Sequence, residues 1–258
     1  MRAIQLEILD DVHAFCDQNG LNYSLSGGTL LGAIRHRGYI PWDDDIDIMM
    51  PRPDYDRFLA TYTSSRNRVI DLSQSELCEE MFAKVSRNGT AMIDHSFGRN
   101  LYGVNIDLFP IEGIPQEGVE SYVNEIVQRK TRITQVIPYY KIVKRGRWMW
   151  WLKCLLKRCR YWNFDAIMKL KAALNERVHS SDFQRSKQVG AVLGSYGMKE
   201  LMPRTACEEY VELPFENRTF RAIGGYEIYL RNLYGDYMQL PPVEKRVSHH
   251  FYDAYIEE

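Results

Sequence analysis

Two aspartates, Asp45 and Asp47, are the residues of this sequence best suited to chemistry, because they lie close together at a regular spacing. They alternate with Ile46 and Ile48, and this two-residue period is typical of a β-strand with one polar face. Both carboxylates should therefore point the same way. Their oxygens are suitable ligands for Mg²⁺, which commonly binds one or two carboxylates together with substrate phosphates. The pair predicts a metal site for phosphate chemistry.

A third carboxylate should come from a neighbouring strand, because two metal ions about 4 Å apart must share ligands to hold both oxygens of an in-line displacement. Asp107 lies in a second alternating segment, 104–109, and is the candidate. We assign Asp45, Asp47 and Asp107 as the predicted catalytic and metal-binding residues. An EF-hand in the same acidic run is excluded, because isoleucine would occupy the position that requires glycine.

A glycine pair, Gly27 and Gly28, lies upstream of the aspartates, between a predicted strand and a predicted helix that begins at Thr29. Glycines at such a junction let backbone N–H groups approach a phosphate, and the N-terminus of the helix adds a favourable dipole. Most glycine pairs are tight turns only, but the aspartates that follow make a phosphate-binding role more specific here. We therefore include Gly27, Gly28 and Thr29 among the predicted substrate-binding residues.

Five ionisable side chains are further candidates for binding an anionic substrate. Arg35, His36 and Arg37 follow the glycine turn and could pair with a diphosphate, although the helix dipole alone also favours cations at a helix end. Lys84 is a lone cation in an apolar strand, which either an anionic partner or a place at the sheet edge would explain. His249 could reach a phosphate, although histidines near a terminus are more often surface residues.

The elements that must position these residues follow from apolar periodicity and turn residues. Helices are predicted over 3–18, 29–37, 54–60, 119–134, 145–162, 164–179 and 226–234. Strands are predicted over 23–25, 45–50, 68–72, 82–86, 90–94 and 104–109, with a strand pair in 212–222. Asn88 and Gly89 should join two of these strands as a hairpin, and Pro110 should end the strand before it. The pattern predicts an α/β (α+β) fold with a mixed sheet core and a helical C-terminal half.

One domain over 1–258 is the simplest organisation, with a core of about 1–115 and a helical, basic portion of about 116–258. Near-average apolar and charged fractions exclude disordered, collagen-like and disulfide-scaffold proteins. Five cysteines, an odd number without a Cys-x-x-Cys motif, argue against structural zinc and favour a reducing cytosol. The acidic N-terminal segment does not resemble a signal peptide, and no apolar run is long enough to predict a membrane-spanning helix.

The net charge of −1 conceals a segregation, since the segment from Ile126 to Phe164 holds eleven Lys or Arg and no Asp or Glu. From Trp148 to Trp162 apolar and basic residues fall on opposite helical faces. This pattern is typical both of a helix lying on a membrane surface and of a helix packed through its Trp face. Peripheral membrane contact through 141–162 is therefore one prediction. Nucleic acid is not a predicted partner, because the rest of the chain is acidic and lacks a recognition motif.

The segment 26–55, which includes the glycine pair and the motif Pro-Trp-Asp-Asp-Asp-Ile-Asp-Ile, closely resembles the LicD family of phosphotransferases. The resemblance spans the chain, since it continues in 82–85, 106–110 and 233–242. It implies a nucleotidyltransferase-like fold, shared with the related fukutin and fukutin-related proteins. The positions that match the superfamily's phosphate-cradling glycines and metal carboxylates are Gly27, Gly28, Asp45, Asp47 and Asp107. One departure is Glu112, which stands where the family's Asp is expected and keeps the charge.

The resemblance also implies a reaction, in which a substituted phosphate, often phosphocholine, passes from a CDP-activated donor to a hydroxyl of a cell-surface glycan precursor and CMP leaves. Positioning and charge neutralisation supply most of the rate in such a transfer. We expect Asp45 and Asp47 to hold one or two Mg²⁺ ions, for which Mn²⁺ could substitute. Asp107 would complete the site or take the proton of the acceptor hydroxyl. Trp42, beside the carboxylates, is the ring we expect to bind a choline ammonium.

We expect a lipid-linked glycan acceptor, of the lipopolysaccharide or teichoic acid type. The cysteine content and the basic segment predict a cytoplasmic enzyme in peripheral contact with the inner face of the cytoplasmic membrane. The sequence is compatible with choline, ethanolamine, glycerol or ribitol as the donor alcohol.

Two alternative functions stay open. A metal-dependent glycosyltransferase would use Asp-x-Asp to hold a nucleotide-sugar diphosphate, although the glycine pair and Asp107 favour phosphoryl transfer. A non-catalytic membrane- or glycan-binding protein could keep the fold, although the intact carboxylates argue against it.

Overall fold

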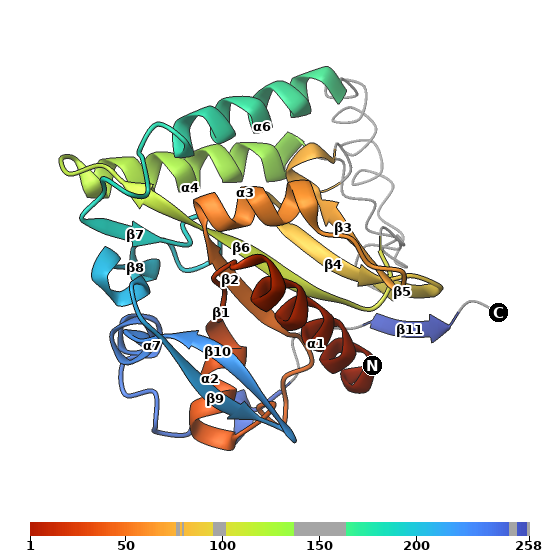
Figure 1. The fold of residues 1–258 in the computed structure, drawn as a ribbon. Helices are drawn as coiled ribbons and strands as arrows, with labels where there is room; N and C mark the ends of the chain where they lie inside the picture. Colours follow the sequence, from red (N-terminus) through yellow and green to blue (C-terminus); the bar gives the residue numbers. More distant parts are fainter. Residues whose placement is uncertain (76–77, 79, 95–101, 137–163, 248–251, 257–258) are drawn as a thin grey trace.

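The strands that carry the predicted carboxylates lie in a mixed β-sheet, seen in the computed structural model of Figure 1. The structure describes residues 1–258 except 76–77, 79, 95–101, 137–163, 248–251 and 257–258. Five strands lie side by side in the order β1 (Ser24–Leu25), β2 (Asp47–Pro51), β6 (Asn105–Ile114), β4 (Ala83–Arg87) and β3 (Asn67–Asp71). β7 (Gln188–Gly190) extends the sheet from β6, and β8 (Leu201–Pro203) pairs with β7.

β2 and β6 run parallel, whereas each other strand pair that the structure describes is antiparallel. The predicted mixed sheet is therefore confirmed. The parallel register places Asp47 directly beside Asp107, and the antiparallel register of β4 on β6 places Lys84 on the other side of Asp107. Three polar residues from three separate strands thus share one row of the sheet.

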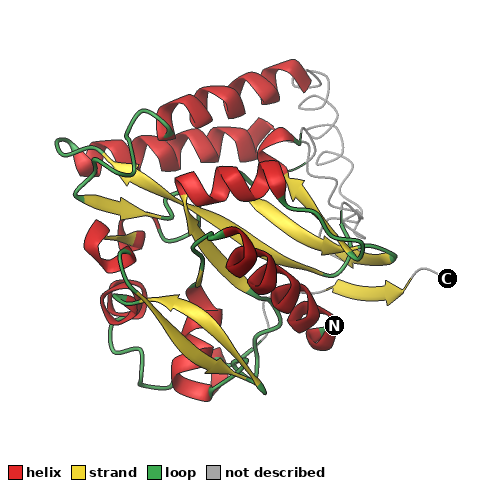
Figure 2. Cartoon of the chain, in the orientation of Figure 1, coloured by secondary structure: helices red, strands yellow, loops and turns green. Residues whose placement is uncertain are grey.

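Helices flank the sheet and the C-terminal hairpin (Figure 2). α1 (Arg2–Asn19) packs against β4 and β6, and α3 (Arg52–Thr61) packs against β2 and β6. α4 (Val119–Val136) and α6 (Phe164–Val178) pack on each other. α2 (Gly27–His36) lies against β2, the hairpin strand β9 (Tyr210–Phe215) and α7 (Tyr226–Tyr234). These contacts place α2 beside the strand that begins at Asp47, and α7 beside α2.

The remaining described elements are short. β10 (Arg218–Ile223) completes the hairpin with β9 as predicted, and β5 (Thr90–Asp94) pairs with β11 (Tyr252–Ile256). The 3₁₀ helices are η1 (Leu72–Gln74), η2 (Gly197–Glu200), η3 (Arg204–Cys207) and η4 (Val243–Lys245). The portion after residue 116 thus holds described strands as well as the predicted helices. The predicted helix 145–162 lies outside the described residues.

The apolar pattern of the sequence accounts for two buried clusters. The larger one contains the apolar face of α1, with Ile8 and Val12 fully buried, and also residues from α7 such as Leu230. The smaller one joins α4 and α6 through Ile126 and Leu174. The larger cluster therefore draws on both the predicted core and the predicted C-terminal portion, as a single domain would require, although the number of domains stays a prediction.

The predicted hairpin between 82–86 and 90–94 is wrong in its pairing. A turn is present at Asn88, and Gly89 has the positive φ of 66° that such a turn requires. However, β4 pairs with β3 and β6, and β5 pairs with β11. A turn motif indicates where the chain reverses, but strand pairing also depends on edges supplied by distant segments.

The predicted end of β6 at Pro110 is also wrong, because the strand continues to Ile114. The ladder with β4 ends at Leu108 and the ladder with β7 begins at Glu112, so Pro110 lies between them. Proline is tolerated there because neither neighbour needs its missing N–H. The longer strand carries Glu112 into the sheet as well as Asp107.

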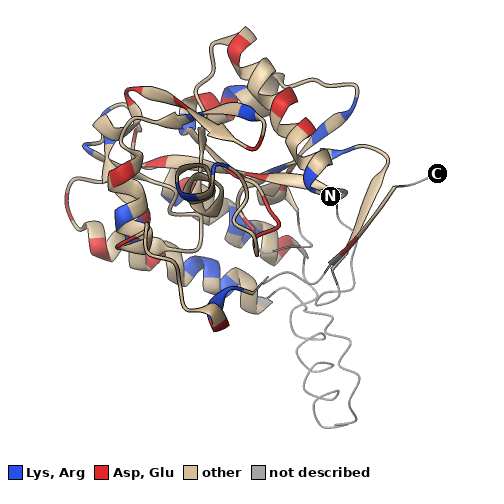
Figure 3. Ribbon diagram, turned by 90° about the horizontal axis from the view of Figure 1, so that it is seen from below, with Lys and Arg blue, Asp and Glu red and all other residues tan. Residues whose placement is uncertain are grey.

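Acidic and basic residues are both scattered over the described elements in the view of Figure 3. Most of the basic segment 126–164 lies outside the described residues, so its predicted membrane contact stays a prediction. In the described part of the chain, no helix combines the length and the apolar character needed to cross a membrane.

Candidate active site

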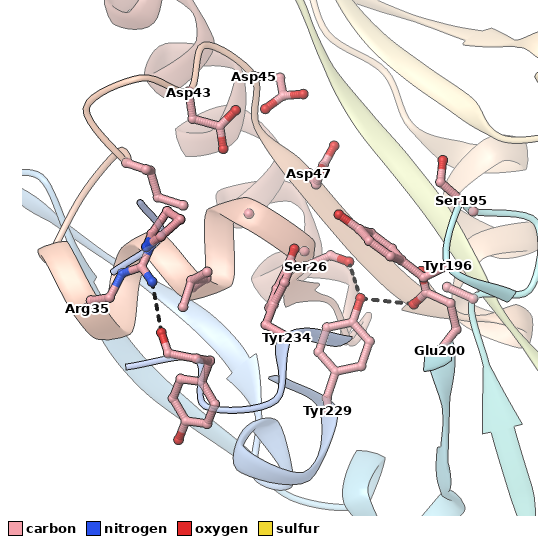
Figure 4. Close-up of a pocket in the computed structure, with 18 of the residues that line it drawn as sticks. Ser26, Arg35, Asp43, Asp45, Asp47, Ser195, Tyr196, Glu200, Tyr229 and Tyr234 are labelled. Carbon is pink, nitrogen blue, oxygen red and sulfur yellow. Dashed lines mark hydrogen bonds between the residues drawn. The ribbon is translucent and has the colours of Figure 1, made fainter. Parts of the chain in front are cut away.

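A pocket of about 870 Å³ lies where the start of β2, the N-terminus of α2, η2 and α7 meet (Figure 4). Its lining includes each predicted catalytic carboxylate, namely Asp45, Asp47 and Asp107. Asp43 also lines it, as do both glycines of the predicted phosphate-binding turn. The sequence thus predicted most of one wall of this pocket.

Asp47 and Asp107 are brought together by strand pairing. They are partners in the parallel ladder of β2 and β6, and the Asp107 backbone N–H donates to the Ile46 carbonyl at 2.8 Å. The expectation that Asp107 comes from a neighbouring strand is confirmed. Asp45 differs from the prediction, because β2 begins only at Asp47 and Asp45 lies in the loop before it.

These carboxylates repel one another. Burial raises the pKa of Asp47 well above its ordinary range, and the charges of Asp45 and Asp107 raise it further. Lys84 opposes this shift without cancelling it. A divalent cation would relieve the repulsion, so the donor set fits a metal such as Mg²⁺.

The acidic set with the closest ligand atoms is not the predicted one. Among the described residues, Asp43, Asp44 and Asp45 each offer a carboxylate oxygen, and these oxygens all lie within 4.8 Å of one another. Asp47 and Asp107 lie on the adjoining strands. The candidate metal ligands therefore extend from the loop 43–45 onto the sheet.

Lys84 has a carboxylate partner, which is one of the two explanations that the sequence left open. Its ammonium makes an ion pair with Asp107, and its side chain is buried. Burial would lower the pKa of Lys84, but the Asp107 carboxylate outweighs it, so that the pKa is raised. The ammonium of Lys84 is thus a positive charge on the sheet that lies beside Asp107 and Asp47.

The glycine pair is required by the close approach of these acids. A Cβ atom at Gly27 would lie 3.2 Å from an Asp47 carboxylate oxygen, and one at Gly28 would lie 2.6 Å from an Asp43 carboxylate oxygen. Gly27 also has a positive φ of 49°. Thr29 is buried and accepts a hydrogen bond of 2.8 Å from the Asp47 N–H. Thr29 therefore fixes β2 on α2, and its hydroxyl has a structural partner.

The three basic residues after the glycine turn separate in the structure. Arg35 lines the pocket and donates to the carbonyl of Tyr237 at 2.9 Å. His36 and Arg37 are not among the residues that line the pocket. Arg37 caps α2 in a left-handed conformation, and its carbonyl accepts from the Glu216 N–H. Of the three, Arg35 alone is placed to contact a pocket ligand directly.

Trp42 lines the pocket, but other side chains already contact its ring. The Arg246 guanidinium lies 5.6 Å from the ring centroid, and His36 packs edge-on at 6.1 Å. His249 lies outside the described residues, so its predicted contact with phosphate stays a prediction.

The far wall of the pocket was not predicted from the sequence. It consists of Glu200 and Tyr196 from the η2 region and Tyr229 and Tyr234 from α7. The Tyr229 hydroxyl donates to Glu200 at 3.1 Å and lies 3.0 Å from the Ser26 hydroxyl (Figure 4). The sequence offered one signal, the resemblance of 233–242 to the LicD family, which includes Tyr234 but not the other three.

The chain is also similar to known proteins along most of its length. Residues 20–150 match the family described as "LicD/FKTN/FKRP, nucleotidyltransferase domain". The chain is 32% identical to the lipopolysaccharide cholinephosphotransferase LicD of Haemophilus influenzae, over 97% of this chain and 95% of that protein. It is also 44% identical to an uncharacterized protein of Rickettsia prowazekii, over 19% of this chain and 18% of that one. Because the family match covers half of the chain and the Haemophilus relative nearly all of it, this protein belongs to the LicD family.

Proposed function

We propose that this protein transfers phosphocholine from CDP-choline to a hydroxyl of a cell-surface glycan and releases CMP. The observation that carries the proposal is the pairing of Asp47 with Asp107 at the wall of a pocket that also contains the N-terminus of α2. The Haemophilus relative, which is a lipopolysaccharide cholinephosphotransferase by name, supports both the group transferred and the class of acceptor.

The proposed cofactor is Mg²⁺, with Mn²⁺ as a substitute. Asp45 and Asp47 would hold it, with Asp43 as a further ligand from the adjoining loop. When bound, the ion would neutralise the diphosphate of the donor and make its phosphorus more electrophilic. The raised pKa of Asp47 supports this assignment, because carboxylates that lie close together repel one another and a bound cation relieves that repulsion.

The chain's own residues would orient the donor. The backbone at Gly27 and Gly28 can approach a phosphate closely because neither residue has a side chain. Arg35 lies on the pocket wall and would pair with the diphosphate. The acceptor hydroxyl would attack the phosphorus, the bond from phosphorus to the CMP oxygen would break, and Asp107 would take the hydroxyl proton.

The test is a transfer assay with CDP-choline labelled in the phosphate attached to choline, with a lipopolysaccharide-type glycan as acceptor. The proposal predicts CMP release together with label in the glycan, and loss of both when EDTA removes divalent ions. Parallel reactions with nucleotide sugars test the glycosyltransferase alternative. Sugar transfer without phosphate transfer would overturn the proposal.

A further inference from the structure

Glu200 is a buried acid at the wall of the pocket, in a position that the proposed transfer does not use. It is 4% exposed, yet it is among the residues that line the pocket. Its carboxylate accepts a hydrogen bond from Tyr229, and in the described part of the chain it has no ion-pair partner. The ammonium of Lys130, whose charge acts on Glu200, donates instead to the carbonyls of Leu193, at 2.7 Å, and Gly194.

Such an acid is costly for the free protein. Burial raises the pKa of Glu200 to about 7, although Tyr229 and Lys130 lower it in part. A carboxylate without a cation in a buried site is stabilised when a positively charged ligand enters. The electrostatics of this wall therefore favour an organic cation.

Aromatic rings stand beside this acid. Tyr196 and Tyr234 both line the pocket, and their centroids are 5.8 Å apart in an edge-to-face arrangement (Figure 4). Aromatic faces attract a quaternary ammonium, which cannot donate a hydrogen bond and loses little when water is excluded. A carboxylate with aromatic neighbours is thus better suited to a trimethylammonium group than to a neutral alcohol.

Trp42, the ring that the sequence suggested, is less suited to this role. Arg246 already lies over its face, and a second cation there would meet a like charge. The aromatic wall at Tyr196 and Tyr234 has no such competitor among the cation–ring contacts of the described residues.

The aromatic wall lies close enough to the proposed reaction centre to bind the ammonium of a choline whose phosphate is held there. The Tyr234 hydroxyl lies 3.9 Å from the position of a Cβ atom at Gly27, and that position is 3.2 Å from Asp47. The aromatic wall therefore begins directly beside the proposed reaction centre. Choline has only two carbons between its nitrogen and the oxygen attached to phosphorus, so its ammonium must bind next to that centre.

Building on the proposed function, we infer that Glu200, Tyr196 and Tyr234 form the subsite for the quaternary ammonium of the donor and select a cationic phospho-alcohol over a neutral one. Tyr229 positions Glu200 by its hydrogen bond and connects it to Ser26 at the start of α2.

The experiment compares Glu200→Gln with the wild type, because glutamine keeps the shape and can still accept from Tyr229 but has no charge. The KM and kcat for CMP release are measured with CDP-choline and with CDP-glycerol, and binding of free choline is measured by calorimetry. We expect the KM for CDP-choline and the Kd for choline to rise about tenfold, with kcat within a few-fold and the KM for CDP-glycerol unchanged.

Two further variants keep the test independent of folding. Tyr196 is 45% exposed, so Tyr196→Leu should fold normally, and it should weaken choline binding more than Tyr196→Phe does. Glu227→Gln, which changes an exposed acid on α7 outside the pocket lining, is the matched control and should leave choline binding unchanged.

Equal KM increases for both donors would show that Glu200 is only structural, and choline binding unchanged in Glu200→Gln would overturn the subsite. The proposed function can fail separately. If the wild type binds choline through Glu200 but transfers no phosphocholine, the subsite stands and the transfer reaction is wrong. If it transfers phosphocholine and Glu200→Gln behaves as the wild type, the transfer reaction stands and the proposed subsite is wrong.

Discussion

Strand β6 carries two acids with opposite electrostatic surroundings, Glu112 and Asp107. Glu112 is 1% exposed and makes a two-contact ion pair with the Arg52 guanidinium, one contact being 3.0 Å from Nε to Oε2. Asp107 shares a single ammonium, that of Lys84, with the neighbouring Asp47. The charge is therefore balanced at Glu112 and in excess around Asp107.

This difference indicates that Glu112 stabilises the fold, whereas Asp47 and Asp107 are suited to binding a cation. Burial would lower the pKa of Arg52, but hydrogen bonds and charge from Glu112 outweigh it, so that the pKa is raised. At Asp47 the effects of burial and of neighbouring charge have the same sign, and both disfavour the carboxylate. The protein retains this unfavourable arrangement at the pocket, as expected for a functional site.

The largest effect that would test this comparison is the loss of activity in Asp47→Ala. Removing a metal carboxylate should lower phosphocholine transfer at least about 10³-fold. The melting temperature should stay the same or rise, because one source of repulsion is removed. Near-normal turnover would overturn the metal assignment. Asp165→Ala, an exposed acid in the first turn of α6, serves as the control.

Glu112→Ala should have the opposite signature. It leaves the Arg52 guanidinium without its buried partner, which should cost about 3–5 kcal/mol of unfolding free energy. Chemical denaturation measures this loss, and the protein that remains folded should keep its kcat. The matched control is Asp56→Ala, since Asp56 is 58% exposed and pairs with the same arginine at 3.0 Å. That variant should cost less than about 1 kcal/mol, and equal losses would refute the contrast.

Asp107→Asn tests whether this acid acts in the reaction or only binds the donor. If Asp107 takes the acceptor's proton, kcat should fall by about 10²- to 10⁴-fold while the donor KM changes little. Steady-state CMP release with varied CDP-choline measures both constants. A rise in donor KM alone would make Asp107 a binding residue, and a thermal melt of the same variant reports the loss of the Lys84 ion pair.

The smallest effect concerns stability against pH at Glu200. Its pKa of about 7 lies above the ordinary 4.5, so the folded state holds this proton more tightly than the unfolded state. The resulting stability is complete below about pH 4.5 and is lost as the pH rises to about 7, by roughly 3 kcal/mol in total. The neighbouring ammonium, Lys130, has a pKa lowered by burial to about 8 and contributes in the opposite sense above that pH.

Melting curves of the wild type and of Glu200→Gln, recorded between pH 5 and pH 7.5, measure this contribution. The two proteins should be similar at pH 5, and the variant should be the more stable by several degrees at pH 7.5. If the difference in melting temperature between the two proteins is the same at all pH values, Glu200 makes no such pH-dependent contribution to stability.

Local elements were predicted from the sequence because their signals are local. The helix predicted over 3–18 and the strand pair predicted in 212–222 need only neighbouring residues, and both are confirmed as α1 and as β9 with β10. Strand partners were predicted less well. β5 pairs with β11, more than 150 residues later, and β6 passes Pro110 because its two antiparallel neighbours leave a gap there.

The sequence by itself determined most of the acidic wall of the pocket, because Asp45, Asp47 and the glycine pair lie within 21 residues of one another, although Asp45 belongs to the loop before β2 and not to the predicted strand. Only the tertiary structure brought Lys84 to Asp107, paired Glu112 with Arg52, and placed Glu200 and the α7 tyrosines in the same pocket as the aspartates. The physical reason is that charge balance depends on distance in space. The sequence does not show whether the charged group nearest to a carboxylate is an arginine or another carboxylate, because that neighbour is set by the tertiary structure.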